Sequence, residues 1–179
     1  HATKLFHTVE GGAVVLHDEE VDRRLYLLRS FGHIGDDHYT LGMNGKMSEV
    51  HAAMGMAVLP HVKRLVAERA RLTEAYDAAL AHLPVQRPVV PEGTGFNHAY
   101  YAVAMPTEAV RVKVTERLQA LGIHPRRYFF PSLDTLPYVR SAPCPVSRDM
   151  AARVLSLPFY PGMPDHLPRT VATAIEEAI

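Results

Sequence analysis

Apolar side chains recur at intervals of three and four residues between Pro60 and Leu83, with arginines and glutamates mostly between them. This spacing places the apolar residues on one face of a helix, and it is the clearest periodic pattern in the chain. The apolar face predicts packing into a hydrophobic core rather than a groove for a partner. It comprises Val62, Leu65, Val66, Leu72, Ala75, Tyr76, Ala79 and Leu80.

Shorter patterns precede this helix. Residues 13–16 are an apolar, β-branched run after two glycines, which predicts a turn followed by a buried strand. Asp18 can cap a helix over residues 19–30, with acids in its first turn. Ser48 begins another helix, whose small side chains permit tight packing. Residues 31–44 are rich in glycine and polar residues, and they predict a long irregular connection between the two helices.

Prolines and glycines cluster between positions 84 and 95, and this cluster predicts a domain boundary. We therefore expect one domain over residues 1–84 and a smaller one over residues 85–179. The second domain reads as α+β, because short apolar runs alternate with amphipathic segments. It is expected to contain strands at 98–105 and 125–130 and helices at 108–121, 149–156 and 165–179.

Composition narrows the classes of protein to consider. The chain has 47% apolar and 21% charged residues, which is typical of a globular domain. Nineteen basic residues balance 19 acidic ones, so no overall positive field would gather nucleic acid or an anionic membrane. The apolar runs are far shorter than the roughly 20 residues of a membrane-spanning helix. With a single cysteine, Cys144, we expect a soluble cytoplasmic protein without disulfides.

A few side chains could carry chemistry. Lys4 lies shortly before a glycine-rich turn, where an amine could be held by the fold yet remain accessible. Its ordinary pKa of about 10.4 means that covalent catalysis would need desolvation or a cofactor, so a solvated surface lysine is the alternative. The histidines show no helical zinc spacing, and no metal site is predicted. The thiol of Cys144 lies between two prolines without a recognisable catalytic histidine.

Short segments spread over the whole chain form a collinear series. The early ones are His1-Ala2-Thr3-Lys4, Glu10-Gly11-Gly12-Ala13-Val14-Val15 and Gly42-Met43-Asn44-Gly45-Lys46-Met47-Ser48-Glu49. The later ones are Ala52-Ala53-Met54-Gly55, His98-Ala99-Tyr100-Tyr101, Arg127-Tyr128-Phe129-Phe130-Pro131 and Leu155-Ser156-Leu157-Pro158-Phe159-Tyr160-Pro161-Gly162. This series resembles the DegT/DnrJ/StrS family of sugar aminotransferases.

The resemblance implies an α/β protein of the pyridoxal-phosphate-dependent transferase fold type I. The chain would contain the end of the large cofactor-binding domain and the small α+β C-terminal domain. Lys4 matches the lysine that carries pyridoxal 5′-phosphate and moves a proton during amino transfer. Asn44 matches a ligand of the cofactor phosphate that the neighbouring subunit contributes, which implies a homodimer.

Two further residues are assigned through the resemblance. His1 matches the histidine in the family pattern serine, x, histidine, x, x, lysine, and it would lie in the cofactor site, although the preceding serine is absent. Tyr128 matches a loop near the sugar pocket and could bind substrate, with a core tyrosine as the alternative. The chain has Ser132-Leu133-Asp134 where relatives often carry a histidine, so that position receives no role.

The function implied is transfer of an amino group, with glutamate as the expected donor, to a nucleotide-linked keto-deoxysugar. Lys4 favours this activity over the dehydratase branch of the family, in which another residue replaces the lysine. The abrupt beginning at His1 supports a second hypothesis, in which the chain is a noncatalytic C-terminal fragment that retains dimer contacts. The chain does not indicate the sugar, the carbon that receives nitrogen or the nucleotide carrier.

Overall fold

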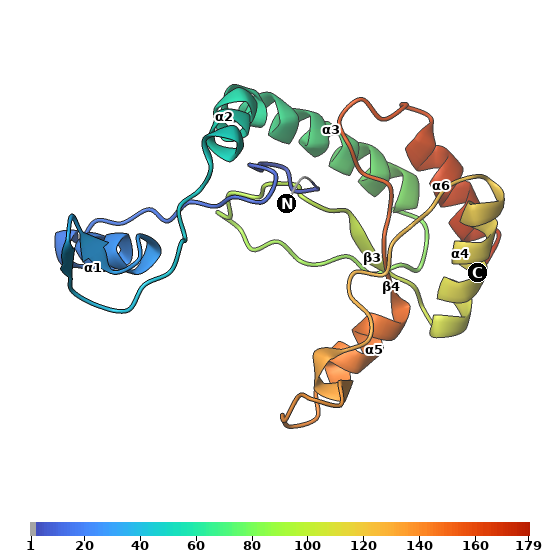
Figure 1. The fold of residues 1–179 in the computed structure, drawn as a ribbon. Coiled ribbons are helices and arrows are strands. Elements are labelled where there is room, and N and C mark those ends of the chain that lie inside the picture. Colours follow the sequence, from blue (N-terminus) through green and yellow to red (C-terminus); the bar gives the residue numbers. More distant parts are fainter. Residues whose placement is uncertain (1–2) are drawn as a thin grey trace. The chain divides into compact units, whose positions relative to one another are not determined.

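The computed structural model describes residues 3–179. Contacts divide the chain into two compact units with the sequence bounds His1–Lys63 and Arg64–Ile179, of which the first is described from residue 3 onward. The first unit contains α1 (Glu19–Arg29), β1 (His33–Ile34), β2 (Asp37–His38), α2 (Glu49–Val58) and a short 3-10 turn at Leu59–His61 (Figure 1). The helix α3 (Val62–Leu80) begins at the junction. The second unit adds β3 (Ala102–Ala104), α4 (Glu108–Ala120), a 3-10 turn at Leu133–Thr135, α5 (Pro145–Arg153), β4 (Val154–Ser156) and α6 (Leu167–Glu176).

Local side-chain caps define the first two helices. The Oδ1 atom of Asp18 accepts a hydrogen bond of 3.0 Å from the backbone N–H of Val21 at the start of α1. The Oγ atom of Ser48 accepts one of 3.3 Å from the N–H of His51 at the start of α2. Each oxygen satisfies one of the backbone donors that a helix leaves open at its first turn. Both predicted helices are therefore confirmed, as is the predicted cap at Asp18.

The strand predicted at residues 13–16 was wrong. These residues are in neither helix nor strand, and the side chains of Val14 and Val15 are 67% and 82% exposed. A β-branched run favours a strand mainly through packing against neighbouring strands. In the described part of this unit the two-residue strands β1 and β2 pair only with each other, so the run lacks such support.

The predicted irregular connection at 31–44 contains a short β-hairpin, which the sequence analysis missed. Strands β1 and β2 pair antiparallel, with His33 opposite His38 and Ile34 opposite Asp37. Gly35, at φ +58°, occupies the tight turn between them. A glycine followed by an aspartate is a recognised turn sequence for two-residue hairpins, and it was the available signal.

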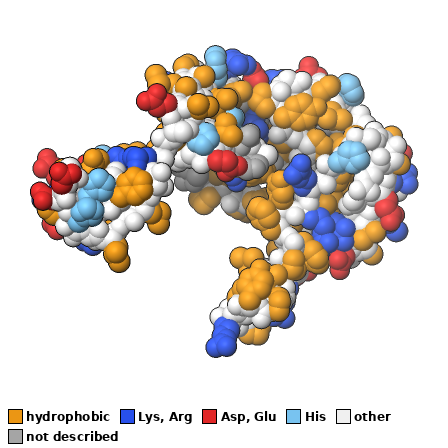
Figure 2. Space-filling model, viewed as in Figure 1, with side chains coloured by type: hydrophobic (Ala, Val, Ile, Leu, Met, Phe, Trp, Pro, Cys, Tyr) orange, Lys and Arg blue, Asp and Glu red, His pale blue; other side chains and the backbone are white. Residues whose placement is uncertain are grey.

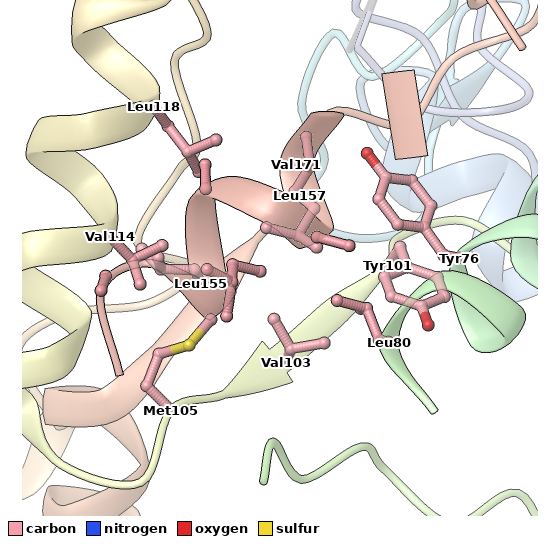
Figure 3. Close-up of a cluster of buried hydrophobic side chains, with 14 of the residues drawn as sticks. Tyr76, Leu80, Tyr101, Val103, Met105, Val114, Leu118, Leu155, Leu157 and Val171 are labelled. Atoms are coloured by element: carbon pink, nitrogen blue, oxygen red, sulfur yellow. The ribbon is translucent and has the colours of Figure 1, made fainter. Parts of the chain in front are cut away.

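The second unit holds a continuous hydrophobic core. Strands β3 and β4 pair antiparallel, with Val103 opposite Leu155, and both side chains are fully buried. Figure 3 shows Val114 and Leu118 of α4 and Val171 of α6 converging on this pair. The long helix contributes Leu72, Tyr76 and Leu80 to the same core, which confirms core packing for the C-terminal part of the predicted face. Val62, Leu65 and Val66, near its beginning, are half-buried and lie outside this core.

Two tyrosines anchor the long helix α3 to this core. The rings of Tyr76 and Tyr101 stack with centroids 4.5 Å apart. The hydroxyl of Tyr76 donates to the carbonyl of Pro158 at 2.9 Å, and that of Tyr101 donates to Asp77 at 2.8 Å. Burial raises the pKa of Tyr101 to about 12, although the guanidinium of Arg87 opposes the shift. These buried hydroxyls are satisfied as neutral donors.

Other predictions for the second unit had mixed outcomes. The helices at 108–121 and 165–179 are confirmed as α4 and α6, and the strand at 98–105 is shorter, as β3. The strand at 125–130 was wrong, because only Arg126 pairs, in an isolated bridge with Ser156. The helix at 149–156 begins earlier, and its last part is β4. Pairing of buried Leu155 with β3 outweighs local helical preference there.

The predicted boundary between residues 84 and 85 stays a prediction, because a compact unit of a chain is not by itself a domain. Within residues 3–179, no helix is both long enough and apolar enough to cross a bilayer.

Candidate functional site

The first candidate residue, Lys4, lies in a bend near the beginning of the described chain, and its side chain is exposed. An exposed primary amine can reach an aldehyde carbon without rearrangement of a core. The other candidate from this segment, His1, lies outside the described residues.

Close packing holds the segment that follows Lys4 against α2. Thr8 is buried, and a Cβ atom added at Gly55 of α2 would lie 2.7 Å from the Cγ2 atom of Thr8. A Cβ at Gly11 would also collide with Thr8 and with Met47. Because Gly11 and Gly55 have no Cβ atom, Thr8 can pack closely against both backbones, which larger residues at these positions would prevent.

The second candidate, Asn44, lies on a loop that the end of α1 holds through backbone hydrogen bonds. The N–H of Met43 donates to the carbonyl of Leu28 and the N–H of Gly45 to that of Arg29, each at 2.8 Å. Asn44 itself forms an isolated antiparallel bridge with Ser30. Backbone hydrogen bonds of the two neighbouring residues, Met43 and Gly45, thus hold the Cα atom of Asn44 in place.

Two glycines make this loop possible. Gly32 follows α1 at φ +78°, and its N–H donates to the carbonyl of Leu27 at 2.7 Å, which ends the helix. A Cβ at Gly42 would lie 2.6 Å from the carbonyl carbon of Phe31 and 2.8 Å from the oxygen of Leu27. Because both neighbours are backbone atoms, a side chain at Gly42 would displace the loop that carries Asn44.

The side chain of Asn44 is exposed and has a defined neighbour. Its Oδ1 atom accepts a hydrogen bond of 2.9 Å from the ammonium of Lys46. That ammonium also lies 4.1 Å from the ring centroid of Phe31. Among residues 3–179, the amide nitrogen of Asn44 makes no hydrogen bond. The loop therefore presents an open N–H donor beside a cation, which suits an anion such as phosphate.

The third candidate, Tyr128, belongs to the second unit and is half-buried. Its hydroxyl accepts a hydrogen bond of 3.0 Å from Arg126. The ring of Tyr100 meets it edge to face at 5.6 Å, and Phe129 stacks on it at 4.9 Å. The structure thus gathers aromatic rings and a guanidinium around Tyr128.

The sequence analysis missed Lys46 and Arg126. Each lies two positions from a candidate residue, and residues i and i+2 of an extended chain share a side. That spacing was a usable signal for both. Within the described chain, Arg126 forms no ion pair with a carboxylate, so its charge is available for an anionic ligand.

Asp134 belongs to the segment Ser132-Leu133-Asp134, to which the sequence analysis gave no role, and its carboxylate holds a loop through hydrogen bonds. Its side chain, 2% exposed, accepts bonds from the hydroxyl of Ser132, the N–H of Cys144 and the guanidinium of Arg148. These donors, led by Ser132, lower the pKa of Asp134 to about 2. The carboxylate is therefore held ionised as a structural acceptor.

No group of three or more potential metal ligands occurs among residues 3–179.

Comparison with solved structures defines the class of protein. The crystal structure of DesI in the presence of its TDP-sugar product superposes with a TM-score of 0.86 at 35% identity, over 99% of this chain and 47% of that one. An aminotransferase of the DegT/DnrJ/EryC1/StrS type from Brucella abortus shares the fold, with a TM-score of 0.79 at 24% identity, over 89% of this chain and 44% of that one. The chain thus contains part of the fold type I architecture of pyridoxal-phosphate-dependent aminotransferases.

The family follows from the sequence comparison. Residues 1–176 match the DegT/DnrJ/EryC1/StrS aminotransferase family, and the chain belongs to it. The dTDP-4-amino-4,6-dideoxy-D-glucose transaminase of Shigella dysenteriae is 31% identical over 185 residues, which cover 99% of this chain and 50% of that protein. The chain spans about half the length of the curated relatives it matches. The resemblance stated from the motifs is thereby confirmed.

The side chains of the first unit fit the cofactor that this family implies. Pyridoxal phosphate presents an aldehyde, which a primary amine can bind, and a phosphate, which needs N–H donors and positive charge. Lys4 is an exposed amine, the amide nitrogen of Asn44 is an open donor, and Lys46 supplies a cation next to it. The donor set therefore has the chemistry for both ends of the cofactor.

Proposed function

We propose that the intact protein, meaning the natural polypeptide that contains this chain, is a pyridoxal-phosphate-dependent aminotransferase. It moves an amino group from glutamate to a keto group of a nucleotide-linked deoxysugar. The match of residues 1–176 to the family carries this proposal. The role of Lys4 in it comes from the motif resemblance of residues 1–4. The relatives from Shigella dysenteriae and Acidithiobacillus ferrooxidans are named as transaminases of nucleotide-linked amino sugars, which supports this class of substrate.

In this proposal Lys4 has two tasks. Its ε-amine holds the cofactor covalently while no substrate is bound, and it then accepts and returns a proton at its Nζ atom. When bound, pyridoxal phosphate supplies the electron sink that makes the substrate carbon acidic. A primary amine can serve as this general base once it is no longer protonated. The exposure of Lys4 gives an aldehyde access to its ε-amine, as the first task requires.

The proposal places Asn44 in the site of a neighbouring subunit, where its amide donates to the cofactor phosphate. A homodimer is then the smallest complete unit, because each chain completes the partner's site. We further propose that His1 contributes to the cofactor site. Residues 1–84 would end the large cofactor-binding domain and residues 85–179 would form the small domain. The setting we propose is the cytoplasm.

Tyr128 is proposed to contact the substrate. Its hydroxyl and the neighbouring guanidinium of Arg126 are 3.0 Å apart, and together they offer hydrogen-bond donors to sugar hydroxyls or phosphates. The exposed ring of Phe129, stacked on Tyr128, adds apolar surface beside these polar groups.

The test is amino transfer by the intact protein carrying Lys4→Ala, supplied with pyridoxal phosphate, glutamate and dTDP-linked 4-keto-6-deoxyglucose. We expect the rate to fall by roughly 10²-fold or more, because the proton-transfer group is removed. Lys113→Ala, at a lysine on α4, serves as the control and should leave the rate unchanged. Unchanged amination in Lys4→Ala contradicts the proposed role of Lys4.

The sequence also left open a noncatalytic, dimerising fragment. A titration of this same polypeptide with pyridoxal phosphate separates that reading from the proposed one. Covalent binding of the cofactor at Lys4 would refute the inert fragment, whereas its absence would limit activity to the intact protein.

A further inference from the structure

The ammonium of Lys46 makes a contact that determines how the side chain of Asn44 is turned. It donates a hydrogen bond of 2.9 Å to the Oδ1 atom of Asn44. A lysine ammonium has three donors and no acceptor, so it can pair only with the oxygen end of an amide. With Oδ1 held by Lys46, the NH₂ group of Asn44 faces away and remains open as a donor.

Lys46 is itself restrained. Its ammonium lies 4.1 Å from the ring centroid of Phe31, a distance at which a cation is attracted to the face of an aromatic ring. Phe31 is held at the end of α1, where its N–H donates to the carbonyl of Met43 at 3.1 Å. The loop that carries Asn44 thus also positions Phe31, the residue whose ring contacts the ammonium of Lys46.

The charge of Lys46 is not cancelled locally. Within the described residues, no carboxylate lies within ion-pair distance of its ammonium, whereas the exposed Arg64 and Arg71 each pair with an acid. The arrangement therefore combines a fixed N–H donor with a net positive charge. An oxyanion with several acceptor atoms, such as a phosphate monoester, matches this combination.

We propose that Lys46 is a positioning residue for the cofactor phosphate, which acts by fixing the amide of Asn44 in the donating orientation. The inference rests on the proposed function, because it takes Asn44 as the residue that contacts the phosphate. Without Lys46, the amide could turn its oxygen toward the anion, and part of the binding free energy would be lost in reorienting it.

The experiment compares the binding of pyridoxal phosphate with that of pyridoxal, which lacks the phosphate. Dissociation constants are measured by fluorescence titration on the intact protein and on Lys46→Met, Asn44→Ala and the double variant. We expect Lys46→Met to weaken pyridoxal phosphate binding about tenfold, the effect of losing about one charge-assisted hydrogen bond, while pyridoxal binding changes less than about twofold. Because Lys46 is exposed, the variant should fold, and unchanged pyridoxal binding verifies that it does.

The double variant decides whether Lys46 acts through Asn44. If it does, Lys46→Met weakens binding clearly less in the Asn44→Ala background than in the unchanged protein, and the loss that remains reflects the removed positive charge. Lys46→Arg keeps a donor and a charge and should restore binding, whereas Lys63→Met, at another exposed lysine, should not weaken it.

Three outcomes overturn the inference, and they differ in what they imply. Additive losses in the double variant would show that Lys46 contacts the phosphate directly or acts by charge alone. A loss in Asn44→Ala with none in Lys46→Met would reject the positioning role and leave the proposed function intact. No loss in Asn44→Ala would remove Asn44 from the phosphate site, and the proposed function would then need another ligand.

Discussion

Different interactions stabilise the two units of the chain internally. In Arg64–Ile179, side chains from three helices and two strands bury one another in a single core. In the described part of His1–Lys63, only Leu27 is a buried hydrophobic residue, while Val15 and Leu41 are 82% and 91% exposed. Figure 2 shows hydrophobic side chains on the surface around α1. Helix caps, backbone hydrogen bonds and glycines give this unit its shape.

A hydrophobic core and a network of backbone hydrogen bonds have different consequences for stability and for ligand access. A packed core makes a unit stable by itself, because it removes apolar surface from water. A loop fixed mainly by backbone bonds keeps its side chains at the surface, where a ligand can reach them. Lys4, Asn44 and Lys46, which we propose to serve the cofactor, all lie in the unit with little core. Tyr128, proposed for the substrate, lies at the surface of the other unit.

The largest expected effect is the loss of a core side chain from the second unit. Leu155→Ala removes a fully buried side chain of β4 and should lower the free energy of unfolding by about 2–5 kcal/mol. Val15→Ala, at an exposed position of the first unit, should change it by less than about 0.5 kcal/mol. Urea unfolding of this chain followed by circular dichroism measures both. Equal effects would show that the two units do not differ as described.

A smaller effect is expected from filling the close contact in the first unit. Gly55→Ala places a methyl group against the stiff side chain of Thr8, and such overpacking costs about 1–3 kcal/mol. The better helix propensity of alanine offsets about 1 kcal/mol of this. Gly12→Ala is the matched control, because no atom lies within 4 Å of an added Cβ there. Amide hydrogen exchange in α2 should accelerate in Gly55→Ala and not in Gly12→Ala.

A third prediction concerns acid stability of the second unit. The pKa of Asp134 is lowered to about 2 by its three donors, against about 3.9 in an unfolded chain. The carboxylate therefore stabilises the fold above about pH 4, and this stabilisation is lost as the pH falls toward 2. The melting temperature of the unchanged chain should fall more steeply between pH 5 and 2 than that of Asp134→Asn. Parallel curves would contradict the role of Asp134.

The smallest effect is expected from a surface ion pair. Arg64 and Glu68 are one helical turn apart on α3, with side chains 62% and 32% exposed. Such a pair contributes about 0.3–0.5 kcal/mol, and salt screens it. A double-mutant cycle with Arg64→Ala and Glu68→Ala should give a coupling energy in this range that shrinks in 1 M salt. A coupling energy above about 1 kcal/mol would show that surface ion pairs contribute substantially to the stability of the second unit, which we attribute to its hydrophobic core.

Local signals predicted most of the helices and the cap at Asp18, because a helix begins where a nearby side chain can accept its first backbone donors. They failed where pairing is set by distant residues. Residues 13–16 have strand-forming side chains but no partner strand within the described part of a chain that spans about half the length of its relatives, and residues 154–156 form β4 because β3 lies beside them. Family motifs predict roles for Lys4 and Asn44, and both roles stay predictions. The contact of Arg126 with Tyr128 could be expected from their spacing of two residues, whereas the contact of Lys46 with Phe31, 15 positions away, depends on the folded loop.

The most direct test of the account is to find where the cofactor attaches. The intact protein is saturated with pyridoxal phosphate, reduced with borohydride, digested and mapped by mass spectrometry. We predict that the pyridoxyl group is found on the peptide that contains Lys4. A label on another lysine, such as Lys46 or Lys63, or the absence of any label, would contradict the central claim.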